Sequence, residues 1–290
     1  MPGVAVVTDT TQYLPREVIA RHDISLVSLY VNWNGRTDRE SDLPDYDAYY
    51  GFLRSTSELP STSQPSVGDF LEVYEPLLEQ GRDILSIHLS GGISGTVGAA
   101  EQARMALVER GIAPERITVV DSQSGCAGHG LMAIAAANAA RDGADLAGAT
   151  AAAHELRANL KVWFAVETLE FLRRGGRIGA ASAWIGSALK IKPILTIENE
   201  IRPIERVRTS GRAFERMVDF LQERREAGAD VYFIQHVQAP ETAARLAERG
   251  RALYGREPEL VSEIGPVIGT HVGPGLIGVS GLPSRLLGPL

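Results

Sequence analysis

The alternation of short apolar runs with helical patterns is the feature that most constrains how this chain can fold. Residues 4–8 form a nearly continuous apolar run that ends at Asp9, and residues 84–89 and 117–120 repeat the pattern. Such runs are typical of strands that are buried on both faces of a sheet. Because amphipathic or alanine-rich segments separate them, the pattern predicts an α/β architecture.

The segments between these runs have the apolar spacing of helices. Residues 67–78 place apolar side chains at i, i+3, i+4, i+7, i+10 and i+11, which together form one face of a helix. Ser66 precedes this segment and Asp69 follows three residues later, so we expect Ser66 to be the N-cap. Two further helices are predicted over 97–108 and 131–140.

The second half of the chain predicts a different succession of elements. We expect a strand over 162–166, a helix over 169–174, a hairpin of 193–197 with 201–207, a helix over about 211–226 capped by Ser210, a strand over 231–237, a helix that starts at Pro240 and ends near 253, and a strand-like end over 264–279.

The alanine-rich stretch 145–159 is the predicted junction between two domains. We expect an N-terminal α/β domain over 1–158 and a C-terminal α/β domain over 159–290, and a length of 290 residues is sufficient for both. We expect that the last strand region, about 264–280, can return towards the first domain.

Charge and cysteine content exclude several classes of function. The net charge of −7 argues against nucleic acid or an anionic membrane surface as the main partner. Cys126 is the only cysteine, which excludes an intramolecular disulfide and a cysteine-based zinc site and fits a reducing compartment. The N-terminus lacks the cationic start of a signal peptide, and no apolar stretch has the length of a membrane span. We therefore expect a cytoplasmic protein.

Two small-residue loops that bear hydroxyl groups, 61–66 and 90–96, each precede a predicted helix. A helix start offers unpaired N–H groups and a partial positive charge, both of which suit an anion. If the two loops face each other, Thr62 and Ser94 could hold a carboxylate or phosphate without a metal ion. The alternative is that both loops are ordinary turns, in which Ser66 and Ser94 serve as helix N-caps.

His271 is the histidine with the most constrained surroundings, since glycines and a proline flank it. It could hydrogen-bond an anion, or it could be a structural residue; His88, within a predicted strand, is expected to be a core residue. An alternative function is an acyl- or phosphoryl-transfer enzyme that uses Ser94, Asp9 or His271. Ser94 lacks the G-x-S-x-G spacing of a nucleophile elbow, and the chain has no Walker-type lysine loop.

Two arginines and two aspartates at strand ends each have a structural and a ligand-binding interpretation. Arg177 follows two glycines and Arg208 ends the predicted hairpin, so each is either a surface cation or a phosphate ligand. Asp9 and Asp121 follow predicted strands, where ligands gather in open α/β sheets, and could bind Mg²⁺.

Seven segments, taken in this order, resemble the DegV family of bacterial fatty-acid-binding proteins. The resemblance covers nearly the whole chain. Its motifs are Val6–Thr10, Thr62–Pro65, Ser94–Thr96, Val120–Ser122, Thr168–Leu172 with Gly175–Arg177, Lys192–Leu195, and Gly269–His271 with Pro274–Gly275. Thr10, Gly91 and Val272 depart mildly from the family pattern.

The resemblance implies two α/β domains with one long-chain fatty acid, such as palmitate, buried between them. It implies a non-enzymatic carrier without a cofactor or metal. In that family, residues that match Thr62, Ser94, Gly95 and His271 lie at the fatty-acid carboxylate. Residues that match Arg177 and Arg208 are implicated in partnership with a fatty-acid kinase that forms acyl phosphate.

Overall fold

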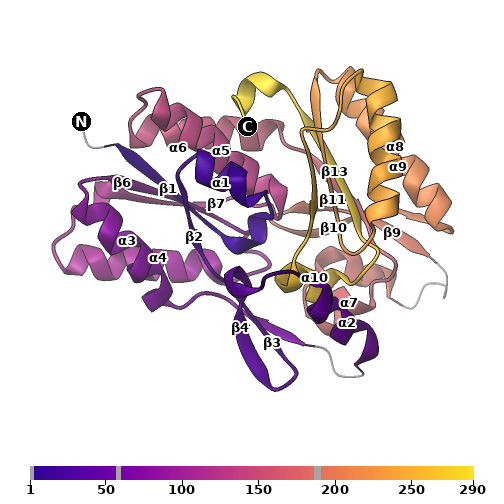
Figure 1. Ribbon diagram of the computed structural model, residues 1–290, viewed down its shortest axis with the longest axis horizontal. Helices are drawn as coiled ribbons and strands as arrows, with labels where there is room; N and C mark the ends of the chain where they lie inside the picture. The colour runs from indigo at the N-terminus through magenta and orange to yellow at the C-terminus, as the bar shows by residue number, and fades with distance from the viewer. Residues whose placement is uncertain (1–2, 57–59, 186–190) are drawn as a thin grey trace.

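The computed structural model describes residues 3–56, 60–185 and 191–290. Within these residues the chain forms a four-stranded sheet, a six-stranded sheet and a small three-stranded sheet, with helices between and around them (Figure 1). The two large sheets lie side by side along the long axis of the molecule. The α/β architecture predicted from the sequence is therefore confirmed.

The four-stranded sheet is parallel and is covered on both faces. Its strands, in spatial order, are β2 (Ile24–Val27), β1 (Val4–Asp9), β6 (Asp83–His88) and β7 (Ile117–Asp121). One face packs against α1 (Arg16–Arg21), α5 (Ala127–Arg141) and α6 (Leu146–Asn159). The other face packs against α3 (Val67–Glu79) and α4 (Thr96–Glu109). Figure 1 shows these two helical layers above and below the sheet.

The six-stranded sheet is mixed and has helices of its own on one face only. Its spatial order is β10 (Glu200–Val207), β9 (Lys192–Glu198), β8 (Val162–Ala165), β13 (Ile277–Leu282), β11 (Val231–His236) and β12 (Leu260–Glu263). All neighbours are antiparallel except β11 and β12. Helices α8 (Ser210–Glu226) and α9 (Pro240–Tyr254) cover one face through a shared apolar core.

A group of short elements lies along the lower edge of the molecule in the view of Figure 1. The three-stranded sheet has the order β4 (Arg36–Arg39), β3 (Tyr30–Trp33) and β5 (Ser61–Ser63). Beside it lie α2 (Asp47–Ser55), α7 (Glu170–Arg174) and α10 (Pro266–Val272) (Figure 1). The described residues also form the 3₁₀ helices η1 (Thr10–Gln12), η2 (Glu40–Asp42), η3 (Pro114–Arg116), η4 (Gly179–Trp184) and η5 (Ser284–Leu286).

Most of the elements predicted from periodicity are confirmed. Ser66 caps α3: its hydroxyl accepts from the Asp69 N–H, and the Asp69 carboxylate accepts from the Ser66 N–H. Pro240 is the first residue of α9, and β9 pairs with β10 as a hairpin whose turn contains only Asn199. His88 is a fully buried core residue. The apolar spacing of the sequence was sufficient to locate these elements.

Two details of the prediction are wrong. Residues 264–279 are not continuously strand-like, because α10 occupies 266–272; Pro266 favours a helix start at this position. The N-cap of α8 is Thr209, whose hydroxyl accepts from the Arg212 N–H, whereas Ser210 is the first helical residue.

The segments near the predicted junction and the chain end join the two halves of the molecule. The stretch 145–159 is helix α6 with its N-cap Asp145, and it packs along α5. Helix α10 contacts α2, β3 and β5, whereas β13 lies in the middle of the six-stranded sheet. The Asn138 amide on α5 donates to the carbonyl oxygens of Leu287 and Pro289.

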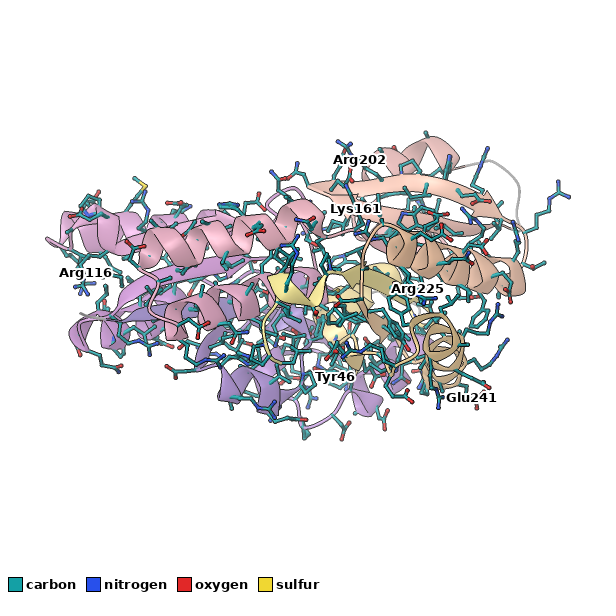
Figure 2. All side chains as sticks on the ribbon, turned by 90° about the horizontal axis from the view of Figure 1, so that it is seen from above. Tyr46, Arg116, Lys161, Arg202, Arg225 and Glu241 are labelled. Atoms are coloured by element: carbon teal, nitrogen blue, oxygen red, sulfur yellow. The ribbon has the colours of Figure 1, made fainter. Side chains whose placement is uncertain are left out.

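The outer surface carries most of the charged side chains. Arg202, Arg225 and Glu241 are exposed, and Figure 2 shows Arg202 and Glu241 at opposite edges of the molecule. Among the described residues, none of the helices combines the length and apolarity required to cross a membrane.

Candidate functional site

A cavity of about 360 Å³ lies between the six-stranded sheet, the start of α5 and helix α10. This volume is in the range of small-molecule sites, which are mostly apolar with a few convergent polar groups. Most of the side chains that line it are apolar, among them Leu29, Leu89, Phe164, Ile197, Val267 and Leu276.

The floor of the cavity is the face of the six-stranded sheet that α8 and α9 leave uncovered. Gly278 on β13 pairs with Phe164 on β8 and with Gln235 on β11, so these residues share one face. All three line the cavity. A Cβ added to Gly278 would have its nearest neighbours at 3.6 Å or more, which is ordinary contact distance. The absence of a side chain here leaves space above the middle of the sheet.

Polar groups from four segments gather at one end of the cavity, which we call the polar end: Thr62, Ser94, Gly95, Arg177 and His271. Thr62 lies on β5 and not in a loop as predicted; β5 is held by its pairing with β3. The Thr62 hydroxyl oxygen is 2.7 Å from Nε2 of His271, which is in the last turn of α10. The structure therefore brings together two candidate residues that are 209 positions apart in the chain.

The two hydroxyl-bearing segments lie against each other, which is the condition that the sequence analysis set for an anion site. A Cβ on Gly95 would come within 1.8 Å of the Gln64 side-chain oxygen, so the end of the Gln64 side chain packs directly on this glycine. Gly95 is the N-cap of α4, and the Ser94 hydroxyl accepts from the Thr96 N–H at 3.3 Å. Ser94 is therefore not the N-cap, although its hydroxyl still satisfies one N–H at the helix start.

Arg177 and Arg208 lie in different surroundings. Arg177 donates from Nε to the carbonyl oxygen of Ile93 at 3.2 Å, which ties its loop to the loop that carries Ser94. Its neighbour Gly175 packs directly on His271, since a Cβ there would be 2.3 Å from the His271 Nδ1. Arg208 is exposed just after β10 and does not line the cavity.

The imidazole of His271 is neutral at physiological pH. Burial and the nearby positive charge of Arg177 lower its pKa to about 4. Within the described part of the chain its Nδ1 has no hydrogen-bond partner. If Nε2 carries the hydrogen and donates to Thr62, the hydroxyl hydrogen of Thr62 is free to be donated to a ligand.

A buried carboxylate that sequence analysis missed holds α10 in place. Glu40 Oε1 accepts from the Val267 N–H and from the Tyr13 hydroxyl, each at 2.8 Å. Burial raises the pKa of Glu40 to about 7, and its Oε2 has no hydrogen-bond partner among the described residues. No local motif surrounds Glu40 in the sequence, so only the fold shows that it supports the helix that carries His271.

Asp9 lies in a separate polar cluster, away from the cavity. Its carboxylate accepts from the Leu89 N–H at 3.0 Å and contacts the imidazoles of His88 and His129 at 3.1 and 3.3 Å. Burial alone would raise the pKa of Asp9, but His129 and His88 hold it well below its usual range. Asp9 is fully buried and does not line the cavity, so it is not placed to act with Ser94 or His271.

The strand-end carboxylates do not form a metal site among the residues that the structure describes. Asp121 accepts from the N–H groups of Gly91 and Gln123, so it fixes the loop that leads to Ser94. No group of three or more histidine, cysteine or acidic side chains in the described ranges has the geometry to hold a metal ion.

Helix α3 does not contribute to the wall of the cavity. Phe70 is fully buried between α3, α4 and the four-stranded sheet, and neither Phe70 nor Leu71 lines the cavity. The sheet floor was missed because a strand that faces a ligand has the same apolar composition as a strand that faces protein.

Comparison with known proteins gives consistent results at the level of sequence and structure. The protein family described as "Uncharacterised protein, DegV family" matches residues 3–284. Protein DegV of Bacillus subtilis is 36% identical over 280 residues, which cover 96% of this chain and 98% of that protein.

Two solved structures superpose on nearly the whole chain. One, described as "Fatty Acid Binding of a DegV family Protein from Thermus thermophilus", has a TM-score of 0.87 and 35% identity and covers 97% of this chain and 99% of its own. The other, DegV of Bacillus subtilis, described as a fatty acid binding protein, has a TM-score of 0.86 and 34% identity with the same coverage.

Proposed function

The chain belongs to the DegV family, and from this membership we propose that it binds one long-chain fatty acid in the cavity and acts as a carrier, not as an enzyme. The observation that carries the proposal is the division of the cavity into one polar end, where hydroxyl groups, a helix N-terminus and Arg177 gather, and an apolar remainder. A fatty acid has the same division, with one anionic head on a long apolar tail. Fatty acid binding by the solved relatives from Thermus thermophilus and Bacillus subtilis supports the proposal.

The carboxylate would be held at the polar end by uncharged donors. We assign the hydroxyl groups of Thr62 and Ser94 and the backbone N–H of Gly95 to this role. The imidazole of His271 lies beside them and donates from Nε2 to the Thr62 oxygen, which leaves the Thr62 hydroxyl hydrogen for the carboxylate. Gly95 is the N-cap of α4, where the partial positive charge of the helix favours an anion. Hydrogen bonds to a charged group contribute about 1.5–3 kcal/mol each, which is sufficient to orient the head group.

The apolar part of the cavity would supply most of the affinity. Each buried CH₂ contributes about 0.8 kcal/mol, so a tail such as that of palmitate gains on the order of 11 kcal/mol before the costs of association and ordering. The tail would then determine affinity, and the polar end would determine direction.

Presentation of the bound acid to a fatty-acid kinase is a further part of the proposal. Arg177 lies at the polar end and is exposed, so it is available both to the carboxylate side of the cavity and to a docked partner. We expect Arg177→Ala and Arg208→Ala to leave fatty acid binding intact and to reduce acyl phosphate formation by a cognate kinase. Arg141→Ala is the matched control, since Arg141 is also exposed but lies at the end of α5.

The proposal also includes the division of the chain into two domains and the compartment in which the protein works. We place the boundary between the two domains at the end of α6, with residues 1–158 and 159–290 on either side, and we propose that the carrier works in the cytoplasm. Limited proteolysis that cuts first near residue 159 would support this boundary.

Denaturing mass spectrometry of the protein purified from cells tests the central proposal. We expect a long-chain fatty acid in close to equimolar amount, and loss of occupancy in a Thr62→Ala, Ser94→Ala double variant. Protein that carries no lipid, and that also takes none up from added palmitate, would rule out the carrier. Turnover of an activated ester that disappears with Ser94→Ala would instead support an enzyme.

A further inference from the structure

Ser280 places a hydroxyl group in the apolar part of the cavity. It lies on β13, where it pairs with Val162 on β8 and with Phe233 on β11. All three residues line the cavity, so their shared face is the one that a bound tail would cover. Ser280 is therefore flanked on both sides by apolar side chains in the middle of the sheet floor.

The Ser280 hydroxyl has no hydrogen-bond partner within the described ranges of the chain, although the residue is only 5% exposed. Other buried polar side chains nearby are satisfied by protein groups. The Gln235 side-chain oxygen accepts from the Ala127 N–H at 2.7 Å, and its amide nitrogen donates to the Ser262 hydroxyl at 2.9 Å. Ser280 thus differs from Gln235 on this face of the sheet, and it lines the cavity.

The hydroxyl also lies far from the polar end. Leu276, Gly278 and Ser280 are alternate residues that line the cavity, and Leu276 follows closely after His271 in the chain. At about 3.3 Å per residue of strand, Ser280 is on the order of 13 Å beyond Leu276. A group that meets Ser280 would therefore belong to the inner part of the acyl chain and not to the carboxylate.

A plain alkyl chain cannot satisfy this hydroxyl. In the ligand-free cavity, water can bond to Ser280, but a bound tail displaces that water and leaves the hydroxyl buried without a partner. Such a loss is unfavourable, whereas a tail that carries its own hydrogen-bonding group would avoid it. The position of the serine therefore discriminates between two classes of long-chain acid.

We propose that Ser280 selects long-chain fatty acids that carry a hydroxyl group within the chain, because its own hydroxyl is an unpaired hydrogen-bonding group on the apolar floor of the cavity. This inference rests on the proposed fatty acid binding and names the class of acid within it. The Ser280 and chain hydroxyls would exchange one hydrogen bond, and neither would be left unsatisfied.

Competition binding with stearate, 2-hydroxystearate, 10-hydroxystearate and 12-hydroxystearate tests the inference. We expect at least one of the two mid-chain hydroxy acids to bind about tenfold more tightly than stearate, whereas 2-hydroxystearate, whose hydroxyl lies next to the head group, gains nothing at Ser280. In Ser280→Ala the preference should disappear, and stearate should bind at least as tightly as to the unmodified protein.

Ser262→Ala is the matched control, because Ser262 also lies on this sheet but does not line the cavity, and it should keep the preference. Thermal unfolding of both variants checks that they are folded. Equal affinity for stearate and both mid-chain acids in the unmodified protein, or an unchanged preference in Ser280→Ala, would overturn the inference while leaving the carrier proposal intact. Failure of all four acids to bind would instead overturn the carrier proposal.

Discussion

The four-stranded and six-stranded sheets of this protein are built from similar strands but differ in what covers them. The parallel sheet has helices packed on both faces, and its central strand β1 is buried along its whole length. The six-stranded sheet has α8 and α9 on one face, while much of its other face forms the floor of the cavity. The comparison shows that the cavity is an uncovered sheet face, closed by α10, α5 and short loops, and not a defect in the packing of a core.

This difference is tested most strongly by adding a large side chain to each sheet. Gly278→Phe should abolish fatty acid binding, with a loss of affinity of at least a hundredfold, because the ring would occupy space that is now empty above Gly278. The fold should survive. Val7→Phe, at a fully buried position of the closed sheet, should instead destabilise the protein by about 1–3 kcal/mol through overpacking.

Fatty acid occupancy by mass spectrometry and chemical denaturation distinguish the two outcomes. If Gly278→Phe proves as destabilising as Val7→Phe and the folded fraction still binds lipid, the floor assigned to β13 is wrong.

Removal of a leucine from each sheet region should sharpen the comparison further. Leu85→Ala, on β6 of the closed sheet, should lower the free energy of unfolding by about 2–5 kcal/mol, as is usual for a fully packed leucine. Leu276→Ala should cost less, since part of this side chain already faces the cavity. Urea unfolding of lipid-free protein measures both changes, and equal losses would contradict the difference in packing.

The closing helix α10 should respond to pH through Glu40. Its folded pKa of about 7 lies above its ordinary value of 4.5, so folding binds a proton between these pH values. The Glu40 contribution to stability is therefore complete below about pH 4.5 and is lost as the pH rises through 7. Because Glu40→Gln stays neutral, we expect it to be more stable than the unmodified protein by about 3 kcal/mol at pH 8 and nearly equal at pH 4.5.

The matched control is His271→Ala. The pKa of His271 is lowered to about 4, so the contribution of His271 to folding stability changes with pH in the opposite direction to that of Glu40. That contribution is present above about pH 6.5 and is lost as the pH falls towards 4. Urea unfolding at several pH values separates the two residues. A stability difference between Glu40→Gln and the unmodified protein that does not vary with pH would contradict the role given to Glu40.

The smallest effect is expected from a single change at the polar end. Thr62→Ala should weaken fatty acid binding by about tenfold, which corresponds to one hydrogen bond to a charged group. Stability should fall by about 1–3 kcal/mol, because the variant also removes the hydrogen-bond partner of the buried His271 imidazole. Titration calorimetry measures the affinity, with Ser61→Ala on the same strand as the control. Equal affinities for the two variants would remove Thr62 from the head-group site.

The sequence predicted the large elements because their apolar spacing is local. The strands around Val4–Asp9 and the capped helix α3 follow from residues within one element. Strand β4, with the sequence Arg-Thr-Asp-Arg, has no apolar alternation and exists only because β3 pairs with it, so no local signal could reveal it. Helix α10 was missed for a related reason, since its apolar residues also suit a strand.

The candidate site divides in the same way. Thr62, Ser94, Gly95 and His271 could be selected from their local chemistry and from the family resemblance, and the structure places all four around one cavity. Glu40 and Ser280 could not be found from the sequence. The role of Glu40 depends on the Val267 N–H, which is distant in the sequence, and that of Ser280 depends on its position in the sheet that lines the cavity.

The position of β13 has a consequence for the order in which the chain can mature on the ribosome. This strand lies between β8 and β11, yet it follows every other strand of the six-stranded sheet in the sequence. Until residues 277–282 emerge, the sheet exists at most as two separate ribbons, β10-β9-β8 and β11-β12, each with an unpaired inner edge that other chains could join. The floor of the cavity can therefore close only after β13 has been made, when all strands of the parallel sheet have long emerged.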